Sequence, residues 1–471
     1  MIRKRLFRVG ACAFALTLVL GAFAAGAGAS RFTPGAPGLG DPFFPLAGNG
    51  GYDVEKYTLK IDYDPATDRL VGTATIVAEA THGLKSFNLD LRDFLTVSSV
   101  RIGTKQGFKM EAAGWSHSGQ ELTVFPREKP REGAFFSVVV EYAGIVEPVE
   151  DPDESIEGFI PTDDGAYVVN EPQGSPGWYP ANDNPNDKAL FDISITVPEG
   201  LTALGNGRLV STSTANEKTT WNWSQSVPMA PYLATASNGR FNLTTTTLPD
   251  GTPNYVAIDS LITSNPAVLA NIPAMQAYFS SIYGPYPPDA IGAIVDRAGF
   301  VGYALESQSK ANYPGMPSSG TLAHEIAHEW FGNSVSLKIW PDMWLNEGFA
   351  RFSEWMWTEN LGSRTAAQAF TTAYSRAATS SFWQIPPAAL PNPAELFNNT
   401  VYERGAMTIQ ALRVKIGELA FWQLVRGWAA DNRYGNVNTA DFIAAAEKAS
   451  GQDLDNFFNV WLFQPGKPTT W

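Results

Sequence analysis

Two of the four histidines in this 471-residue chain lie four positions apart, in the string HEIAH that runs from His324 to His328. On a helix, positions i and i+4 share one face, so both imidazoles can bind the same zinc ion. Glu325 follows the first histidine, and we expect its carboxylate to face a water molecule rather than the metal. Glu347 lies nineteen positions after His328 and can supply a third ligand. Two imidazoles and one carboxylate leave one position for water, which is typical of catalytic zinc.

Two helices must position these side chains. The residues around HEIAH favour a helix, with Ser318 or Ser319 as its N-cap and Gly332-Asn333 as its end. An HExxH string alone also occurs on surface helices that bind no metal. The second helix therefore decides whether the string is interpreted as a zinc site or as part of such a surface helix. The sequence predicts that this second helix starts near Asp342 and carries Glu347. Together the two helices predict one zinc ion per chain.

A fourth residue of this region has a predicted supporting role. Glu354 lies seven positions after Glu347, which is two turns along the same helix face. Histidines that bind zinc usually donate their other ring N–H to an acceptor, so we expect Glu354 to orient His324. Asn333 and Asn346 are interpreted as residues that make local hydrogen bonds.

The charge of the chain excludes some classes of partner. The formal net charge is −14, and residues 1–29 contain four basic and no acidic residues, so the remainder carries −14 − 4 = −18. A chain this acidic repels nucleic acid and anionic lipid, and we expect neither as a partner. The composition is that of a soluble globular protein, and the length predicts two or three domains.

The first 29 residues are typical of a secretory signal peptide. A basic start, MIRKRLFR, precedes an apolar stretch and the small-residue string Ala27-Gly28-Ala29. We therefore predict cleavage after Ala29 and secretion. The alternative is an uncleaved membrane anchor, because the apolar stretch is about long enough to span a bilayer. No later segment is apolar enough for stable membrane insertion. Cys12 is the only cysteine, so cleavage would exclude disulfides and thiol chemistry.

The rest of the chain divides by its pattern into three parts. Residues 30–51 are rich in proline and glycine and predict an extended lead-in. From 52 to 243, short apolar runs alternate with turn residues, and 191–197 alternates apolar with polar positions, which predicts a β-sandwich or saddle-shaped domain. From 244 to 471 helical patterns dominate, with a strand at 290–296, which predicts a helical catalytic domain with a small sheet. Further helices are predicted at 265–283, 364–380, 401–417, 419–431 and 438–450, and in the string DLDNFFNVWLF.

With HEIAH, Glu347 and the flanking string WLNEGFA, the chain resembles the aminopeptidase N family of gluzincin zinc metallopeptidases, peptidase family M1. Two stretches of the β half also resemble that family, GNGGYDVEKYTLKIDYDPATDRLVGTATI and WYPANDNPNDKALFDISITVPEG. The resemblance covers nearly the whole chain after the signal segment. It implies a saddle-like β domain followed by a thermolysin-like catalytic domain, and hydrolysis of the N-terminal peptide bond with one zinc ion.

The resemblance also assigns substrate-binding residues. The family has a GAMEN-type segment some twenty residues before its HExxH string, and the matching stretch here is YALES, residues 303–307. In relatives the glutamate of this segment, here Glu306, binds the free α-amine of the substrate. Ala304 and Leu305 would line the same substrate edge. The first and last residues of YALES depart from the family's Gly and Asn, which implies a different shape of that edge.

Two more positions match residues with known roles in the family. Glu171 lies twelve positions before Asp183-Asn184-Pro185, where relatives have a second residue that binds the amine. Tyr402, in the string YERG, matches a tyrosine that stabilises the oxyanion, although Arg404 replaces the usual lysine. The chain stops at QPGKPTTW, where relatives continue into another β domain and a helical domain that roofs the active site. The resemblance therefore implies a short form with a more open cleft.

These observations predict a secreted zinc aminopeptidase that acts on peptides with a free N-terminus. In this hypothesis Glu325 is the general base and Tyr402 hydrogen-bonds the oxyanion. One alternative is an endopeptidase that uses the same zinc in an open cleft. The other is a secreted protein that binds peptides without cleaving them. Comparing the cleavage of peptides with blocked and with free N-termini distinguishes an endopeptidase from an aminopeptidase. Any turnover of a peptide excludes the protein that only binds.

Overall fold

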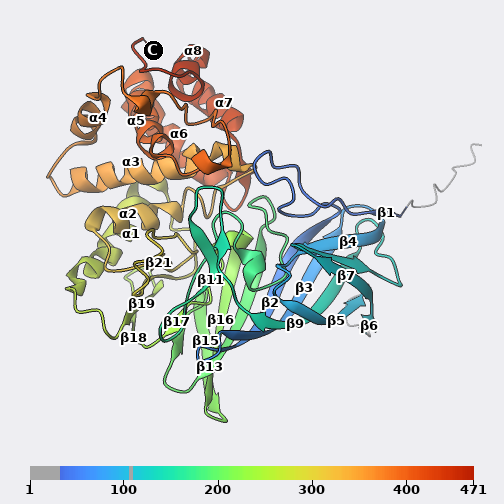
Figure 1. The fold of residues 1–471 in the computed structure, drawn as a ribbon. Coiled ribbons are helices and arrows are strands. Elements are labelled where there is room, and N and C mark those ends of the chain that lie inside the picture. Colours follow the sequence, from blue (N-terminus) through green and yellow to red (C-terminus); the bar gives the residue numbers. More distant parts are fainter. Residues whose placement is uncertain (1–31, 105–109, 471) are drawn as a thin grey trace, which may run out of the picture. The chain divides into compact units, whose positions relative to one another are not determined.

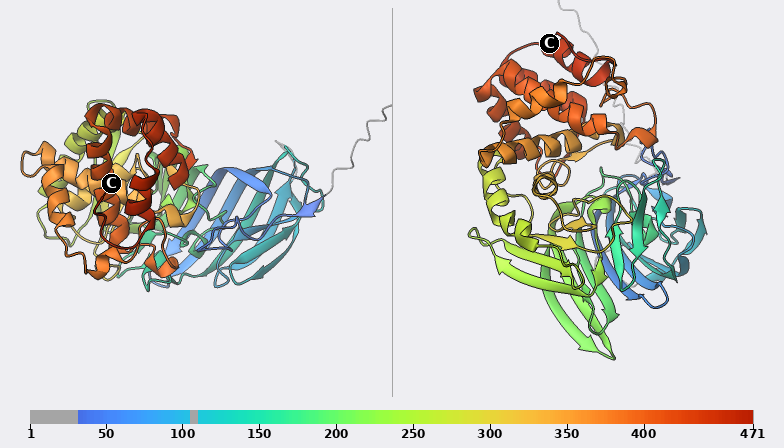
Figure 2. Two further views of the ribbon diagram at one scale, coloured as in Figure 1. Left: turned by 90° about the horizontal axis from the view of Figure 1, so that it is seen from above. Right: turned by 60° about the vertical axis from the view of Figure 1, so that its left-hand side comes forward.

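The computed structural model describes residues 32–104 and 110–470 (Figure 1). The predicted signal peptide, its cleavage site and Cys12 lie outside the described residues. Within the described part of the chain, no helix is both long and apolar enough to cross a membrane. Strands make up the first half and helices dominate the second, as the sequence pattern predicts (Figures 1 and 2).

The largest sheet has eight strands and forms the main layer of the β half. Phe191, Ile193, Ile195 and Val197 are each at most 1% exposed, and the residues between them are more exposed. This is the predicted half-buried strand with a period of two. In spatial order, the strands are β15 (Arg208–Ala215), β16 (Lys218–Met229), β13 (Ala189–Pro198), β2 (Tyr52–Asp64), β3 (Arg69–Ala80), β9 (Phe135–Ile145), β5 (Thr96–Gly103) and β6 (Glu111–Ala112).

A four-stranded sheet packs against this layer and completes a sandwich. Its strands, in order, are β1 (Thr33–Pro34), β4 (Leu84–Asp90), β8 (Glu121–Phe125) and β7 (Gly114–Ser118). The ring of Tyr52 on β2 lies edge-on to that of Phe87 on β4, at 5.7 Å between centroids, and such pairs fill the space between the layers. The predicted lead-in contributes only the short β1. Its Asp41 accepts a hydrogen bond from the Trp340 amide at 2.8 Å, which ties it to the helical half.

Two smaller sheets lie between the large sheet and the helices. The first contains β10 (Val149–Glu150), β11 (Ile156–Pro161), β12 (Ala166–Val169), β17 (Asn238–Gly239) and β14 (Thr202–Ala203). The second contains β18 (Phe241–Thr247), β19 (Pro253–Asp259), β20 (Ile291–Val295) and β21 (Ala311–Tyr313). Strand β20 is the strand predicted at 290–296. The predicted domain boundary at 243/244 falls inside β18, which pairs with β19 along its whole length.

Eight α-helices are the main elements of the second half of the described residues, and the two that carry the zinc motif are neighbours (Figure 1). They are α1 (Ile272–Tyr283), α2 (Ser319–His328), α3 (Trp344–Asn360), α4 (Ala366–Tyr374), α5 (Asn399–Ile416), α6 (Glu418–Asp431), α7 (Thr439–Ser450) and α8 (Asp455–Phe458). Helix α3 packs against α2 on one side and α5 on another. A short pair of strands, β22 (Ser336–Leu337) and β23 (Asn436–Val437), connects the turn after α2 to the segment before α7.

The predicted helices are present, but some of their ends differ. The helix predicted at 364–380 already ends at Tyr374. Ser375 Oγ donates to the Thr372 carbonyl at 2.7 Å, and such side chains compete for the backbone groups that would continue a helix. The last predicted helix is the short α8, continued by a π-helical turn at Asn459–Phe463.

Candidate active site

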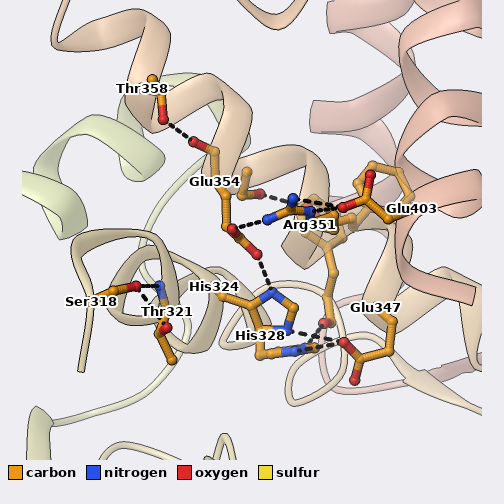
Figure 3. Close-up of polar contacts among 12 residues, drawn as sticks. Ser318, Thr321, His324, His328, Glu347, Arg351, Glu354, Thr358 and Glu403 are labelled. Atoms are coloured by element: carbon orange, nitrogen blue, oxygen red, sulfur yellow. Dashed lines mark hydrogen bonds and ion pairs between the residues drawn. The ribbon is translucent and has the colours of Figure 1, made fainter. Parts of the chain in front are cut away.

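Helices α2 and α3 bring His324, His328 and Glu347 together (Figure 3). Their candidate ligand atoms all lie within 4.8 Å of one another. Glu347 Oε2 is 3.0 Å from His324 Nε2 and 3.6 Å from His328 Nε2. The side chains of His328 and Glu347 are buried. Two imidazole nitrogens and one carboxylate oxygen around one point form the donor set of a catalytic zinc site.

The second nitrogen of each imidazole already has an acceptor. His324 Nδ1 lies 2.9 Å from Glu354 Oε1, which is the contact predicted from the spacing on α3. His328 Nδ1 lies 3.0 Å from the Phe331 carbonyl. These acceptors place the ring proton on Nδ1 and turn each Nε2 toward Glu347. The residues therefore fit a zinc ion in both ligand type and tautomer.

The local sequence explains how α2 presents its histidines. Ser318, one of the two predicted caps, accepts a hydrogen bond from the Thr321 amide at 3.0 Å and starts the helix. The turn after the helix contains Gly332 with φ +128°, a conformation that side chains disfavour. A Cβ at this position would also lie 3.1 Å from His328 Nδ1. Glycine therefore permits both the sharp turn and the orientation of His328.

Glu325 lies on α2 beside the metal ligands and lines the same cavity. Glu325, Glu306 and His328 also place ligand-type atoms within 4.8 Å of one another. Glu325 therefore lies next to both His328 and Glu306. Burial raises the pKa of Glu325 to about 7, and the two imidazoles act in the opposite direction.

Glu171, two residues after β12, and Glu306, next to the bridge residue Leu305, line the cavity together. Glu306 accepts a hydrogen bond from Tyr232 Oη at 3.4 Å, and its backbone carbonyl accepts one from Asn333 Nδ2 at 2.8 Å. Within the described residues, Oε1 of Glu171 is buried and has no hydrogen-bond donor. Burial raises the pKa of Glu171, and the charge of Glu306 is the next cause. Among the described residues, neither of these two buried carboxylates forms an ion pair, whereas Glu347, Glu354 and Glu403 of the same lining do.

Tyr402 lies in the first turn of α5, and its ring stacks against that of His324, with 6.0 Å between centroids and 23° between planes. Burial, and then the charge of Glu347, holds the pKa of Tyr402 well above its usual value. The phenol therefore keeps its proton and stays a hydrogen-bond donor.

Arg404, where the family has lysine, is buried and donates to the Trp461 carbonyl at 2.8 Å. Arg404 thus anchors the segment around Trp461, and it is not part of the cavity lining.

One cavity of about 510 Å³ contains every site residue predicted from the sequence. These residues are Glu171, Ala304, Leu305, Glu306, His324, Glu325, His328, Glu347 and Tyr402. The structure brings them together, and their individual roles stay predictions. Seven further residues of the lining were not predicted from the sequence: Asp153, Ser155, Thr321, Arg351, Phe397, Asn399 and Glu403. Arg351, one turn after Glu347, and Glu403, next to Tyr402, could have been found from their helix positions.

Two family models match the chain in the order of its two halves. The Peptidase M1 N-terminal domain matches residues 53–233, and the Peptidase family M1 domain matches residues 305–461. Aminopeptidase N of Lactococcus lactis subsp. lactis is 26% identical over 457 residues, which cover 88% of this chain and 51% of that protein. Aminopeptidase M1-D of Oryza sativa subsp. japonica is 27% identical over 317 residues, which cover 62% of this chain and 36% of that protein. The chain thus spans 36% to 51% of the length of these two curated relatives.

Solved structures extend the likeness to the arrangement of both halves. The M1 zinc metallopeptidase from Deinococcus radiodurans is 27% identical, with a TM-score of 0.84 over 92% of this chain and 98% of that chain. A mutant of that enzyme bound to a Tyr-Ser-Ala substrate gives a TM-score of 0.83 at 26% identity, over 92% of this chain and 98% of that chain. The β half and the helical half therefore both have counterparts of known structure.

Proposed function

The chain belongs to peptidase family M1, and on this basis we propose that it is a zinc-dependent aminopeptidase that removes residues from the free N-terminus of peptides. One observation carries the choice of an aminopeptidase. Glu306 and Glu171 are 3% and 5% exposed beside the metal ligands, and Oε1 of Glu171 has no donor among the described residues. A buried carboxylate without a donor is costly, and a substrate ammonium would supply both the charge and the hydrogen bonds.

The metal ligands and two neighbouring side chains divide the chemistry between them. His324, His328 and Glu347 would hold a zinc ion, which would supply Lewis acidity and lower the pKa of a bound water molecule toward about 7. Glu325 accepts a proton from the attacking water and returns it to the nitrogen of the leaving group. Tyr402 donates its hydroxyl proton in a hydrogen bond to the carbonyl oxygen as negative charge develops there.

The amine-binding carboxylates determine which bond is cleaved. With the ammonium held by Glu306 and Glu171, the first peptide bond is the one that reaches Glu325 and the metal. Ala304 lies two residues before Glu306 on the cavity edge, and no hydrogen bond within the described residues uses its amide or carbonyl. Those backbone groups can therefore pair with an extended peptide, as an exposed strand edge does.

We also propose that the chain is exported and that its signal peptide is removed after Ala29. The basic start, the apolar stretch and the Ala27-Gly28-Ala29 string support this proposal. N-terminal sequencing of the protein recovered from its native cells tests it. A mature N-terminus at Ser30 in the soluble fraction supports cleavage, and an intact N-terminus in the membrane fraction supports the anchored alternative.

Digestion of a tripeptide with a free N-terminus tests the proposed activity. Purified protein should release the first residue alone, lose activity with a strong chelator and regain it with zinc. Mass spectrometry of a longer peptide separates the alternatives. Initial cuts at internal bonds would support an endopeptidase, and an absence of turnover with bound zinc would support a peptide-binding protein.

A further inference from the structure

Arg351 lies on α3, one turn after Glu347, and joins two acidic residues of the cavity lining (Figure 3). Its Nε donates to Glu403 Oε1 at 2.8 Å, and its Nη2 is 2.6 Å from the same oxygen. Its Nη1 donates to Glu354 Oε2. One planar guanidinium thus holds a carboxylate of its own helix and a carboxylate of α5.

Each of these carboxylates is next to a residue of the candidate active site. Glu354 Oε1 is the acceptor 2.9 Å from Nδ1 of His324. Glu403 directly follows Tyr402 in the first turn of α5. A chain of polar contacts therefore runs from His324 through Glu354 and Arg351 to Glu403. It ends beside Tyr402, whose ring stacks on that of His324.

The packing of α3 against α5 shows what this chain of polar contacts can restrain. At their crossing, Gly348 faces Gly405, and a Cβ on Gly348 would lie 3.0 Å from the Gly405 backbone. Two glycines let the helices approach closely, but they provide no interlocking side chains there to set the rotation of one helix on the other. The Arg351–Glu403 ion pair adds this restraint at the end of α5 that carries Tyr402.

We propose that Arg351 is a positioning residue, which fixes Tyr402 over the zinc ligands by holding Glu403 and Glu354 in one chain of ion pairs. The proposal rests on the function proposed above, in which Tyr402 hydrogen-bonds the substrate carbonyl. Such a donor works at about 2.7–3.1 Å from the oxygen. A displacement of about 1 Å therefore lowers the rate by up to about 10²-fold. Removing Arg351 also leaves two poorly solvated carboxylates close together, with 17% and 11% exposure for Glu354 and Glu403.

A double-mutant cycle of Arg351→Gln and Tyr402→Phe tests this inference. On a peptide with a free amine, Arg351→Gln should lower kcat by about 10- to 100-fold and leave KM within about twofold, because only the transition-state contact weakens. In the Tyr402→Phe background, the same change should lower kcat by less than about threefold, since the positioned hydroxyl is already absent. Arg351→Lys keeps the positive charge but lacks the planar guanidinium that donates to both carboxylates, so its kcat should lie between those of Arg351→Gln and the wild type. Arg101→Gln removes an exposed pair with Glu141 and serves as the control.

Two measurements do not depend on turnover. A crystal structure of zinc-loaded Arg351→Gln should show the Tyr402 ring displaced from His324. Competition with a chelator should show zinc affinity close to wild type. Loss of the hydrogen-bond partner of a zinc-bound histidine usually lowers zinc affinity by about 10- to 100-fold. A fall of that size would show that Arg351 positions His324 rather than Tyr402, and it would overturn the proposal.

The proposal would also be overturned if Arg351→Gln lowered kcat by the same factor in the wild-type and Tyr402→Phe backgrounds. A crystal structure of Arg351→Gln in which the Tyr402 ring has not moved would overturn it too. If Arg351→Gln does not fold, Glu403→Gln breaks the same link and must give the same non-additive result with Tyr402→Phe. Failure of the proposed function looks different. In that case the wild-type protein releases no N-terminal residue, or Tyr402→Phe itself leaves kcat unchanged.

Discussion

Acetylation of the N-terminus of a peptide substrate should slow its cleavage by about 10³-fold, because it removes the charge that two buried carboxylates are arranged to bind. Glu306 and Glu171 are 3% and 5% exposed, so they have little contact with water that could take the place of the missing ammonium. Each charge-assisted hydrogen bond contributes about 1.5–3 kcal/mol. Two of them give about 3–6 kcal/mol, and about 1.4 kcal/mol corresponds to a factor of ten in rate. The expected ratio is therefore about 10²- to 10⁴-fold.

The assay compares kcat/KM for one peptide in its free and acetylated forms, with the products identified by mass spectrometry. Glu306→Ala should lower kcat/KM for the free peptide far more than for the acetylated one, so the ratio between them narrows. The acetylated peptide is thus the internal control for general damage to the site. Comparable rates for the two peptides, or first cuts at internal bonds, would refute the aminopeptidase proposal. The endopeptidase alternative would then replace it, with the same metal ligands.

Four further outcomes are expected. His324→Ala combined with His328→Ala should abolish stoichiometric zinc in the purified protein, and metal analysis that still finds one zinc per chain would contradict the ligand assignment. Glu325→Gln should abolish turnover while zinc stays bound, so substantial activity free of contaminating peptidases would exclude it as the base. Tyr402→Phe should lower kcat by about 10²-fold or more, as measured on a free-amine peptide. A kcat equal to that of the wild type would show that another group stabilises the oxyanion. Gly348→Ala should destabilise the fold by about 1–3 kcal/mol in chemical denaturation, because its Cβ would lie 3.0 Å from the α5 backbone. An unchanged midpoint would show that the helices can separate without cost.

The metal ligands could be predicted from the sequence because their geometry is almost entirely local. The i, i+4 spacing places His324 and His328 on one face of any helix, and a short connection returns Glu347 to them. The position of Glu354 follows from the same periodicity, and its contact with His324 is present at 2.9 Å. The alternation at residues 191–197 predicted a strand for an equally local reason, since successive strand residues point to opposite faces.

The limits of local pattern appear at element ends and in the cavity lining. Nothing periodic marks Ser375 as the residue that ends α4, because a side-chain hydrogen bond decided it. The β-domain loop that brings Asp153 and Ser155 to the cavity shows no motif at all.

The tertiary structure alone decided which distant residues meet. Arg351 and Glu403 lie 52 positions apart, and their contact exists only once α5 packs on α3 through two glycines. Glu171 and Glu306 could be paired only by resemblance to relatives, and their position in one cavity depends on how the segment after β12 packs against the segment before β21. Helices and strands form through hydrogen bonds and periodic burial within short stretches, which leave a repeating pattern in the sequence. Contacts between elements far apart in the chain leave no such pattern, so the charge, burial and shape of the cavity appear only in the folded protein.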